Sequence, residues 1–153
     1  MSEFAMTVRE MDENDMERVL EIQETTHFES WKEKTLRDLV RKTYTFAYVA
    51  EAPDDAGIWK VAGYAVFSLA ADEAELLAIS TAPEFYRKGI ATELFAEGDE
   101  ALADAGARTF YLEVREDNDR AIAFYRKLGF DKCGMRESYY ADGENAVLMS
   151  RPL

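Results

Sequence analysis

One stretch of the chain, residues 110–130, constrains the fold more than any other. Its first six residues are mostly apolar and β-forming, which is typical of a buried strand. Asp117 or Asn118 then supplies the short polar side chain of a helix N-cap. Apolar residues follow at helical spacing as far as Gly129, a residue type that commonly ends helices. A strand followed by a capped amphipathic helix is a unit of proteins that pack helices on a sheet. The chain is therefore expected to be an α/β protein.

The same patterns divide the rest of the chain into strands and helices. Strands are expected at residues 6–11, 44–51, 59–69, 75–81, 108–115, 130–139 and 144–151. Helices are expected after an N-cap at Asp12, over residues 32–42, over residues 90–105 and after residue 118. The order is β-α-α-β-β-β-α-β-α-β-β. It predicts a single domain over residues 1–153, with a mixed central sheet of about seven strands and helices on both faces.

The sequence favours a cytoplasmic protein. It has no run of roughly 18 apolar residues that would span a membrane, and it lacks the basic and then apolar start of a signal peptide. The single cysteine, Cys133, cannot form an internal disulfide and is expected to fill the core as a small apolar residue. No metal-ligand spacing occurs in the sequence, so no metal is expected. We expect a monomer or a weak dimer.

Acidic residues outnumber basic residues, 31 against 18, so the formal net charge is −13. A field of that sign opposes binding to nucleic acid and to anionic membranes, and neither is expected as a partner. An anionic ligand would have to be held by local cations and backbone N–H groups. A salt-rich cytoplasm and ordinary solubility are both open as explanations of the acidic surface.

Residues 82–91, between an expected strand and an expected helix, have the features of an anion-binding loop. Gly89 lets the backbone turn and approach a ligand closely, and the helix start offers unpaired N–H groups and the positive end of its dipole. Arg87 and Lys88 add two cations. Taken alone, these features also fit a plain connection, and the segment lacks the Gly-Lys-Ser/Thr of a P-loop.

Glu113 and Tyr125 are polar residues within apolar patterns. Glu113 interrupts the expected strand, where its carboxylate would be partly shielded from water. Tyr125 lies on the apolar stripe of the following helix, where a phenol needs a hydrogen-bond partner. Taken alone, Glu113 could equally pair with a neighbouring cation, and Tyr125 could be a core residue.

Together these segments resemble the GNAT superfamily of N-acetyltransferases. Residues 83–91 are similar to its acetyl-CoA loop, with the pattern Q/R-x-x-G-x-G/A: Arg87, Gly89 and Ala91 fit, and Tyr86 departs from it at the Q/R position. The residues that resemble the second half of the fold are Leu112, Glu113, Val114, Arg115, Asn118, Ala121, Ile122, Tyr125, Leu128, Gly129 and Phe130. The resemblance covers essentially the whole chain and is strongest to the ribosomal-protein alanine N-acetyltransferase (RimI-type) branch.

The resemblance implies acetyl-CoA as the cosubstrate and a role for each matching residue. Glu113 resembles the general base of the family and Tyr125 its general acid, while Tyr139 and Glu75 would line the substrate groove. A backbone N–H in residues 77–79 would donate a hydrogen bond to the oxyanion of the tetrahedral intermediate. The residues implied in cofactor binding are Leu77, Ile79, Ser80 and Thr81 on a splayed strand, Arg87, Lys88, Gly89, Ile90, Ala91 and Thr92 around the pyrophosphate, and Asn118.

The expected function is direct transfer of an acetyl group from acetyl-CoA to an amine, with the N-terminal amine of a protein favoured. An α-amine has a pKa near 8, so about one-tenth of it is free at pH 7, against about 0.04% of a lysine amine. A GNAT activity on lysine side chains or small amines remains an alternative. A non-catalytic acyl-CoA-binding module is an alternative of another class. His27, the single histidine, is expected to have a structural or substrate-loop role.

Overall fold

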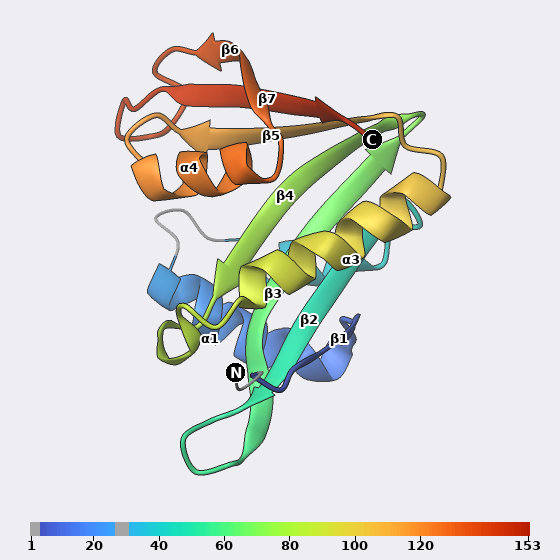
Figure 1. Cartoon of the computed structure of the whole chain (residues 1–153), viewed down its shortest axis with the longest axis vertical. Coiled ribbons are helices and arrows are strands. Elements are labelled where there is room, and N and C mark those ends of the chain that lie inside the picture. The colour runs from blue at the N-terminus through green and yellow to red at the C-terminus, as the bar shows by residue number, and fades with distance from the viewer. Residues whose placement is uncertain (1–3, 27–30) are drawn as a thin grey trace.

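The computed structural model describes residues 4–26 and 31–153, and His27 lies outside these ranges. Within them, seven strands form one mixed sheet, and helices pack against it (Figure 1). The strands are β1 (Thr7–Glu10), β2 (Thr45–Pro53), β3 (Trp59–Ala70), β4 (Glu73–Thr81), β5 (Thr109–Arg115), β6 (Asp131–Arg136) and β7 (Ala146–Pro152). The helices are α1 (Met16–Thr26), α2 (Glu33–Val40), α3 (Ile90–Asp104) and α4 (Asp119–Lys127), with short 3-10 turns at Glu13–Asp15 and Pro83–Phe85. The element order expected from the sequence is confirmed.

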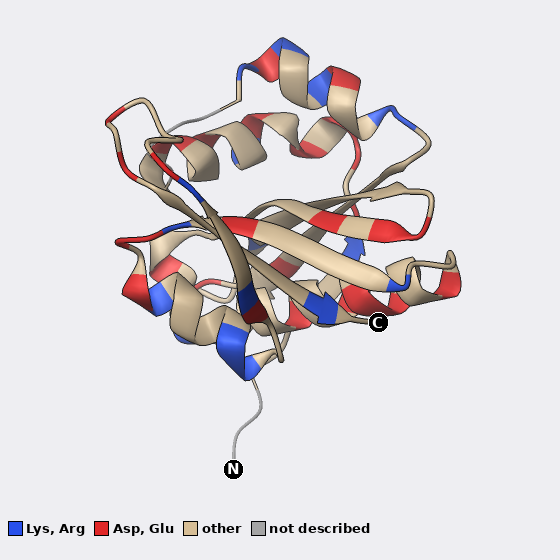
Figure 2. Ribbon diagram, turned by 90° about the horizontal axis from the view of Figure 1, so that it is seen from above, with Lys and Arg blue, Asp and Glu red and all other residues tan. Residues whose placement is uncertain are grey.

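Helices cover both faces of the sheet, as the sequence predicts. In Figure 1, α3 crosses the near face over β2, β3 and β4, α4 lies on the same side, and α1 lies behind the strands. Seen from above, the sheet runs between two layers of helices (Figure 2). The side chains of β5 alternate accordingly: Phe110 and Leu112 are 0% and 2% exposed, whereas Tyr111 between them is 37% exposed. Glu113 therefore shares the outer face of β5 with Tyr111.

The sheet has two antiparallel halves joined by one short parallel pairing, in the strand order β1-β2-β3-β4-β5-β7-β6. β4 pairs with β5 over residues 73–76, ending with Leu76 opposite Leu112. Beyond that point β4 stays paired with β3 as far as Thr81, while β5 continues beside β7 to Arg115. The β3–β4 register slips by one residue at the same level, which leaves Leu77 in a bulge. The two halves of the sheet therefore diverge.

Aromatic rings hold the two halves together on the side of α3. Phe95 of α3 stacks on Phe110 of β5 with the ring centroids 5.2 Å apart. Both rings meet Phe67 of β3 edge-on, with centroids 5.9 Å apart. Phe130 adds a further edge-on contact with Phe110 at 5.4 Å. Because stacked and edge-to-face pairs favour particular geometries, this cluster ties β3 of one half to β5 of the other through α3.

The loop between β6 and β7 begins earlier in the chain than the sequence predicts. The expected strand reaches residue 139, but β6 ends at Arg136. Ser138 adopts a left-handed backbone with φ of 50°, which takes the chain out of the extended conformation. The Tyr140 N–H donates to the Glu144 carbonyl at 3.1 Å and closes a turn before β7. The loop therefore carries Tyr139 and Tyr140 away from the edge strand.

Cys133 lies exposed on β6, so the expectation that it fills the core is wrong. β6 is the edge strand of the sheet, and most of its residues are exposed. Within the described part of the chain, no helix combines the length and the apolar character needed to cross a membrane.

Candidate active site

A cleft of about 1380 Å³ opens where β4 and β5 diverge. Its walls come from β4, β5, the start of α3, α4 and the β6–β7 loop. The predicted site residues that line it are Glu75, Leu77, Ile79, Ser80, Thr81, Arg87, Gly89, Ile90, Ala91, Thr92, Glu113, Asn118, Tyr125 and Tyr139. The fold thus brings together residues that are up to 64 positions apart in the sequence, from Glu75 to Tyr139.

The start of α3 forms one end of the cleft. Gly89 is its N-cap, with a left-handed φ of 82°, and Arg87 before it also has a positive φ, 63°. A side chain cannot cap the helix at a glycine, so the first N–H groups of α3 are left for water or a ligand. A Cβ built on Gly89 would meet nothing within 4 Å. The loop therefore combines exposed amides, a helix dipole and a cation, which is the arrangement that binds phosphate groups.

Lys88 is the one predicted residue that the structure places away from the cleft lining. Its Nζ atom lies 5.2 Å from the centroid of the Phe4 ring, a distance typical of a cation–π contact. Arg120, in the first turn of α4, lines the cleft instead. With Arg115 at the end of β5, the cations that line the cleft therefore come from three parts of the chain rather than from adjacent residues of one loop.

The free edge of β4 forms a second part of the cleft. Residues 78–81 pair with β3 on one side, Leu77 lies in the bulge before them, and on the other side all five residues face the gap left by β5. Backbone groups along such an edge can bond to an extended ligand as a further strand would. Ser80 is buried, and its hydroxyl shares a hydrogen bond with the hydroxyl of Thr26 on α1. That bond ties the edge of β4 to α1.

Two carboxylates, Glu75 and Glu113, lie near the point of divergence with Arg136 and Tyr139. The Arg136 Nε atom lies 3.6 Å from a Glu113 carboxylate oxygen. A hydrogen bond to Glu113 raises the pKa of the Tyr139 phenol, since losing the proton would break it. Burial raises the pKa of Glu75, and the negative charge of Glu113 raises it further. Glu113 is thus held from two sides, by a phenol and by a guanidinium.

Tyr125 lines the cleft from α4. It is 7% exposed, and its ring packs edge-on against Phe130 with centroids 6.2 Å apart. Burial raises the pKa of its phenol well above the usual value, with a smaller contribution from Tyr140. The phenol therefore keeps its proton at neutral pH and can act as a hydrogen-bond donor. Asn118 caps the same helix by accepting from the Ala121 N–H at 3.1 Å, which fixes where α4 begins.

Sequence reasoning missed several residues that line the cleft, among them Thr26, Trp31 and Arg120. Trp31 is positioned by α1, because its backbone N–H and carbonyl both bond to the Gln23 side chain, at 3.0 and 2.8 Å. Only the fold shows that α1 meets the edge of β4. Arg120 carried a weak signal, as a cation in the turn after the Asn118 cap.

The described ranges contain no group of three or more His, Cys, Asp and Glu residues placed to hold a metal ion. The arrangement instead offers an anion-binding helix start, a free strand edge, and a carboxylate from β5 and a phenol from α4 in the lining of one cleft. Such a site can hold a long ligand that ends in phosphates. It can also remove a proton from one reacting group and donate one to another.

Comparisons with known proteins agree with this geometry. The sequence matches the model of the acetyltransferase (GNAT) family over residues 16–130. It is 30% identical over 150 residues to the [ribosomal protein bS18]-alanine N-acetyltransferase of Escherichia coli K12, covering 96% of this chain and 97% of that protein. It is 47% identical over 79 residues to an N-alpha-acetyltransferase of Saccharolobus solfataricus, covering 51% of this chain and 47% of that protein. The crystal structure of Ard1 from Thermoplasma volcanium superposes with a TM-score of 0.87 at 31% identity, covering 97% of this chain and 98% of that one.

Proposed function

The chain belongs to the acetyltransferase (GNAT) family and uses acetyl-CoA as its cosubstrate, and we propose that it acetylates the N-terminal α-amine of a protein. The observation that carries the proposal is one cleft that joins the helix start at Gly89 to Glu113 and Tyr125. The names of two relatives support this acceptor, since one acts on the alanine of ribosomal protein bS18 and the other is an N-alpha-acetyltransferase. An alanine N-terminus of a ribosomal protein is therefore the acceptor to test first.

The residues of the cleft fit acetyl-CoA. The amides at the start of α3, with Arg87, would hold the pyrophosphate, because a helix N-terminus and a cation both favour negative charge. Residues 77–81 would bond the amide groups of the pantetheine arm along the free edge of β4. Asn118 would contact the cofactor from the start of α4. When bound, acetyl-CoA supplies the thioester carbonyl that is attacked and the sulfur that leaves.

Glu113 and Tyr125 would divide the proton transfers between them. An α-amine is about nine-tenths protonated at pH 7, so a base must take its proton before the nitrogen can attack, and we assign this to Glu113. Tyr125, whose raised pKa keeps it protonated, would donate a proton towards the leaving sulfur. A backbone N–H at the Leu77 bulge would donate a hydrogen bond to the thioester carbonyl oxygen and stabilise the negative charge that develops on it.

Tyr139 and Glu75 would face the acceptor. Both line the cleft beside Glu113, and Tyr139 is 48% exposed, so its ring is available to a peptide. Trp31 lines the cleft from the side of α1. A peptide N-terminus could enter between these aromatic side chains and place its amine at Glu113.

An acceptor panel tests the proposal. Purified protein and acetyl-CoA are incubated with peptides that begin with alanine, with N-terminally blocked peptides that contain lysine, and with small polyamines. Thiol release gives the rate and mass spectrometry locates the acetyl group. We expect acetylation at the free N-terminus and at least tenfold slower reaction at lysine, since far less of that amine is unprotonated.

Two results would contradict the proposal. Acetylation of lysine or polyamines alone would place the chain among GNAT enzymes with other acceptors. Acetyl-CoA binding without thiol release on any amine would indicate a binding module.

A further inference from the structure

Arg136, the last residue of β6, approaches Glu113 from outside the cleft. β6 is separated from β5 by β7, with Arg136 opposite Ala146 and Glu113 opposite Leu148. The arginine side chain spans that distance and brings its Nε atom to 3.6 Å from a Glu113 oxygen. Its guanidinium also lies 5.5 Å from the centroid of the Tyr139 ring. The side chain thus touches both partners of the Tyr139–Glu113 hydrogen bond.

A second groove, of about 420 Å³, continues from the cleft along the outer face of the sheet. Glu75 and Glu113 line both the groove and the cleft, whereas Arg136 lines the groove. The two carboxylates therefore form the border between the two hollows. The titratable groups that face this border are Glu73 and Glu75 from β4, Tyr111 and Glu113 from β5, Cys133 and Arg136 from β6, and Tyr139 from the β6–β7 loop.

Two neighbouring carboxylates need a compensating charge. Each disfavours the ionised form of the other, and a pair without a cation tends to share a proton. At Glu75, burial and the negative charge of Glu113 raise the pKa, and the positive charge of Arg136 lowers it. A carboxylate that shares a proton cannot accept another from an amine. The pair therefore depends on a cation that lies close to it but leaves the cleft free.

We propose that Arg136 is a positioning residue that balances the charge of the Glu75–Glu113 pair, so that Glu113 meets the acceptor amine as a free carboxylate. The inference rests on the proposed function, because it acts through the base of that reaction. Arg136 makes no contact with the reacting atoms in this scheme. It holds Glu113 from the groove side, while the acceptor amine approaches from the cleft.

The pH dependence of kcat/KM tests this role. In Arg136→Gln, we expect the acidic limb of the profile to move to higher pH by about one unit, because an opposite charge within 4–6 Å shifts a carboxyl group by that order or more. Activity should fall by about tenfold on the acidic side and recover towards pH 9. The ionisation of the peptide amine is the same in every assay, so a difference between variants belongs to the enzyme.

Three further variants separate charge from shape. Arg136→Lys keeps the charge but loses the flat group beside Tyr139, and we expect a wild-type acidic limb. Arg136→Gln combined with Glu75→Gln removes the cation and one carboxylate together. In this double variant the acidic limb of the pH profile should return to its wild-type position. Lys132→Gln removes an exposed cation from the same strand and should leave the limb in place. If Arg136 had a purely structural role, Arg136→Lys would lose activity as Arg136→Gln does. Adding Glu75→Gln to Arg136→Gln would then leave the acidic limb shifted.

A titration without any acceptor completes the test. In protein with ¹³C-labelled glutamate side chains, the NMR titration midpoint of Glu75 should rise further in Arg136→Gln, by about half a unit to one unit. An unchanged midpoint, or an unchanged acidic limb in an enzyme that acetylates peptides, would overturn the inference and leave the proposed function standing. If the wild-type enzyme acetylates no peptide N-terminus, the proposed function fails, and the Glu75 titration still decides whether Arg136 balances the pair.

Discussion

Among single residues, Glu113 and Tyr125 decide whether the cleft is catalytic. We expect Glu113→Gln to lower kcat by about 10²–10⁴-fold, the usual contribution of one positioned proton-transfer group, with little change in acetyl-CoA affinity. Raising the pH should partly rescue this variant, since the amine then loses its proton unaided. Tyr125→Phe should lower kcat without alkaline rescue, because burial keeps the wild-type phenol protonated as the pH rises.

Steady-state kinetics from pH 6 to 10 on both single variants and the double variant measure this. The two losses should combine less than additively if both groups act in one transition state. Glu100→Gln and Tyr44→Phe are matched controls, since both side chains are exposed and outside the cleft lining. Near-wild-type turnover in Glu113→Gln or in Tyr125→Phe would remove that residue from the mechanism.

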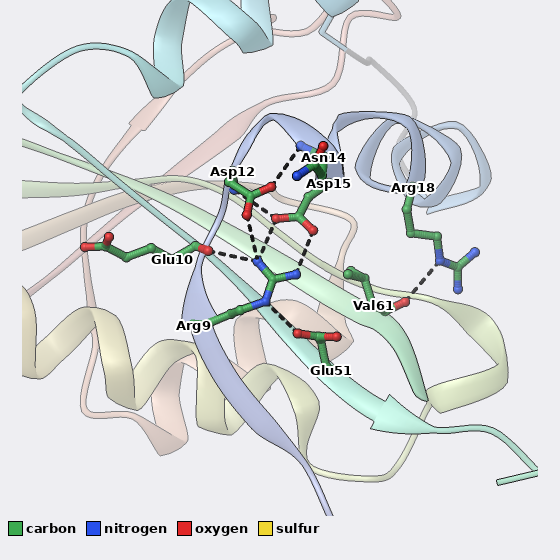
Figure 3. Close-up of polar contacts among 8 residues, drawn as sticks. All are labelled: Arg9, Glu10, Asp12, Asn14, Asp15, Arg18, Glu51 and Val61. Carbon is green, nitrogen blue, oxygen red and sulfur yellow. Dashed lines mark hydrogen bonds and ion pairs between the residues drawn. The ribbon is translucent and has the colours of Figure 1, made fainter. Parts of the chain in front are cut away.

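Asp15 illustrates a residue that serves stability instead. It is 5% exposed and accepts two hydrogen bonds from the Arg9 guanidinium, each 2.8 Å, with Glu51 on the far side of the same arginine (Figure 3). Burial alone would raise the pKa of Asp15, but the hydrogen bonds from Arg9 and from the Asp12 N–H lower it below its usual value. Asp15 also completes a capping box with Asp12 at the turn before α1.

A depressed pKa gives a defined pH dependence. The stabilisation is present above the unfolded-state pKa, near 3.9, and it is lost as the pH falls through the lower folded-state value. Asp15→Asn should therefore lower the free energy of unfolding by about 1–3 kcal/mol at pH 7 and by much less near pH 3. Urea denaturation at both pH values measures the difference. Glu13→Gln, which breaks an exposed pair with Arg41, serves as the control. An equal loss for Asp15→Asn at both pH values would contradict the assignment.

At the scale of elements, the divergence of β4 from β5 creates the site. The sequence predicted both strands, the helix after each of them and many of the residues that line the cleft, because those follow from local periodicity, caps and the resemblance. It could not predict that the β4–β5 pairing stops at Leu76, since register depends on contacts between strands far apart in the chain. The same limit explains why Thr26 and Trp31 were missed and why Lys88 was expected in the cleft.

Gly89 tests the start of α3 as an element. Its φ of 82° favours glycine, so Gly89→Ala should destabilise the fold by about 1–2 kcal/mol or move the loop. A moved loop misaligns the first amides of α3, and we expect acetyl-CoA affinity to fall by about tenfold or more. Calorimetric titration with acetyl-CoA measures it.

Gly57 is a matched control for that substitution. It lies in the turn between β2 and β3, its φ is 80°, and a Cβ built there also meets nothing within 4 Å. Gly57→Ala should cost similar stability and leave acetyl-CoA affinity unchanged. Equal acetyl-CoA affinity in wild type and Gly89→Ala would indicate that the phosphates do not bind at the start of α3.

For the whole molecule, the net charge of −13 is the dominant long-range term. Acidic residues lie on the helices of both layers and on the loops (Figure 2), so their mutual repulsion acts on the entire compact state. Opposing it are local ion pairs such as Arg18–Glu21 and Lys34–Asp38, which are exposed and contribute little each. Salt weakens both terms but reduces the long-range repulsion more, because the screening length falls from about 30 Å at 0.01 M to about 8 Å at 0.15 M.

We therefore expect the protein to become more stable as salt is added. Between 0.01 and 0.3 M NaCl the free energy of unfolding should rise by about 1 kcal/mol, which corresponds to roughly 2–5 °C in Tm for a domain of this size. Glu100→Lys, an exposed change on α3, should raise Tm at low salt and reduce the gain from salt, because it replaces a negative charge by a positive one and changes the net charge from −13 to −11. Sucrose at equal osmolality controls for exclusion of cosolutes, since it leaves charges unscreened. A Tm that falls with salt would mean that the local ion pairs outweigh the repulsion, and the acidic surface would then be a network of paired charges.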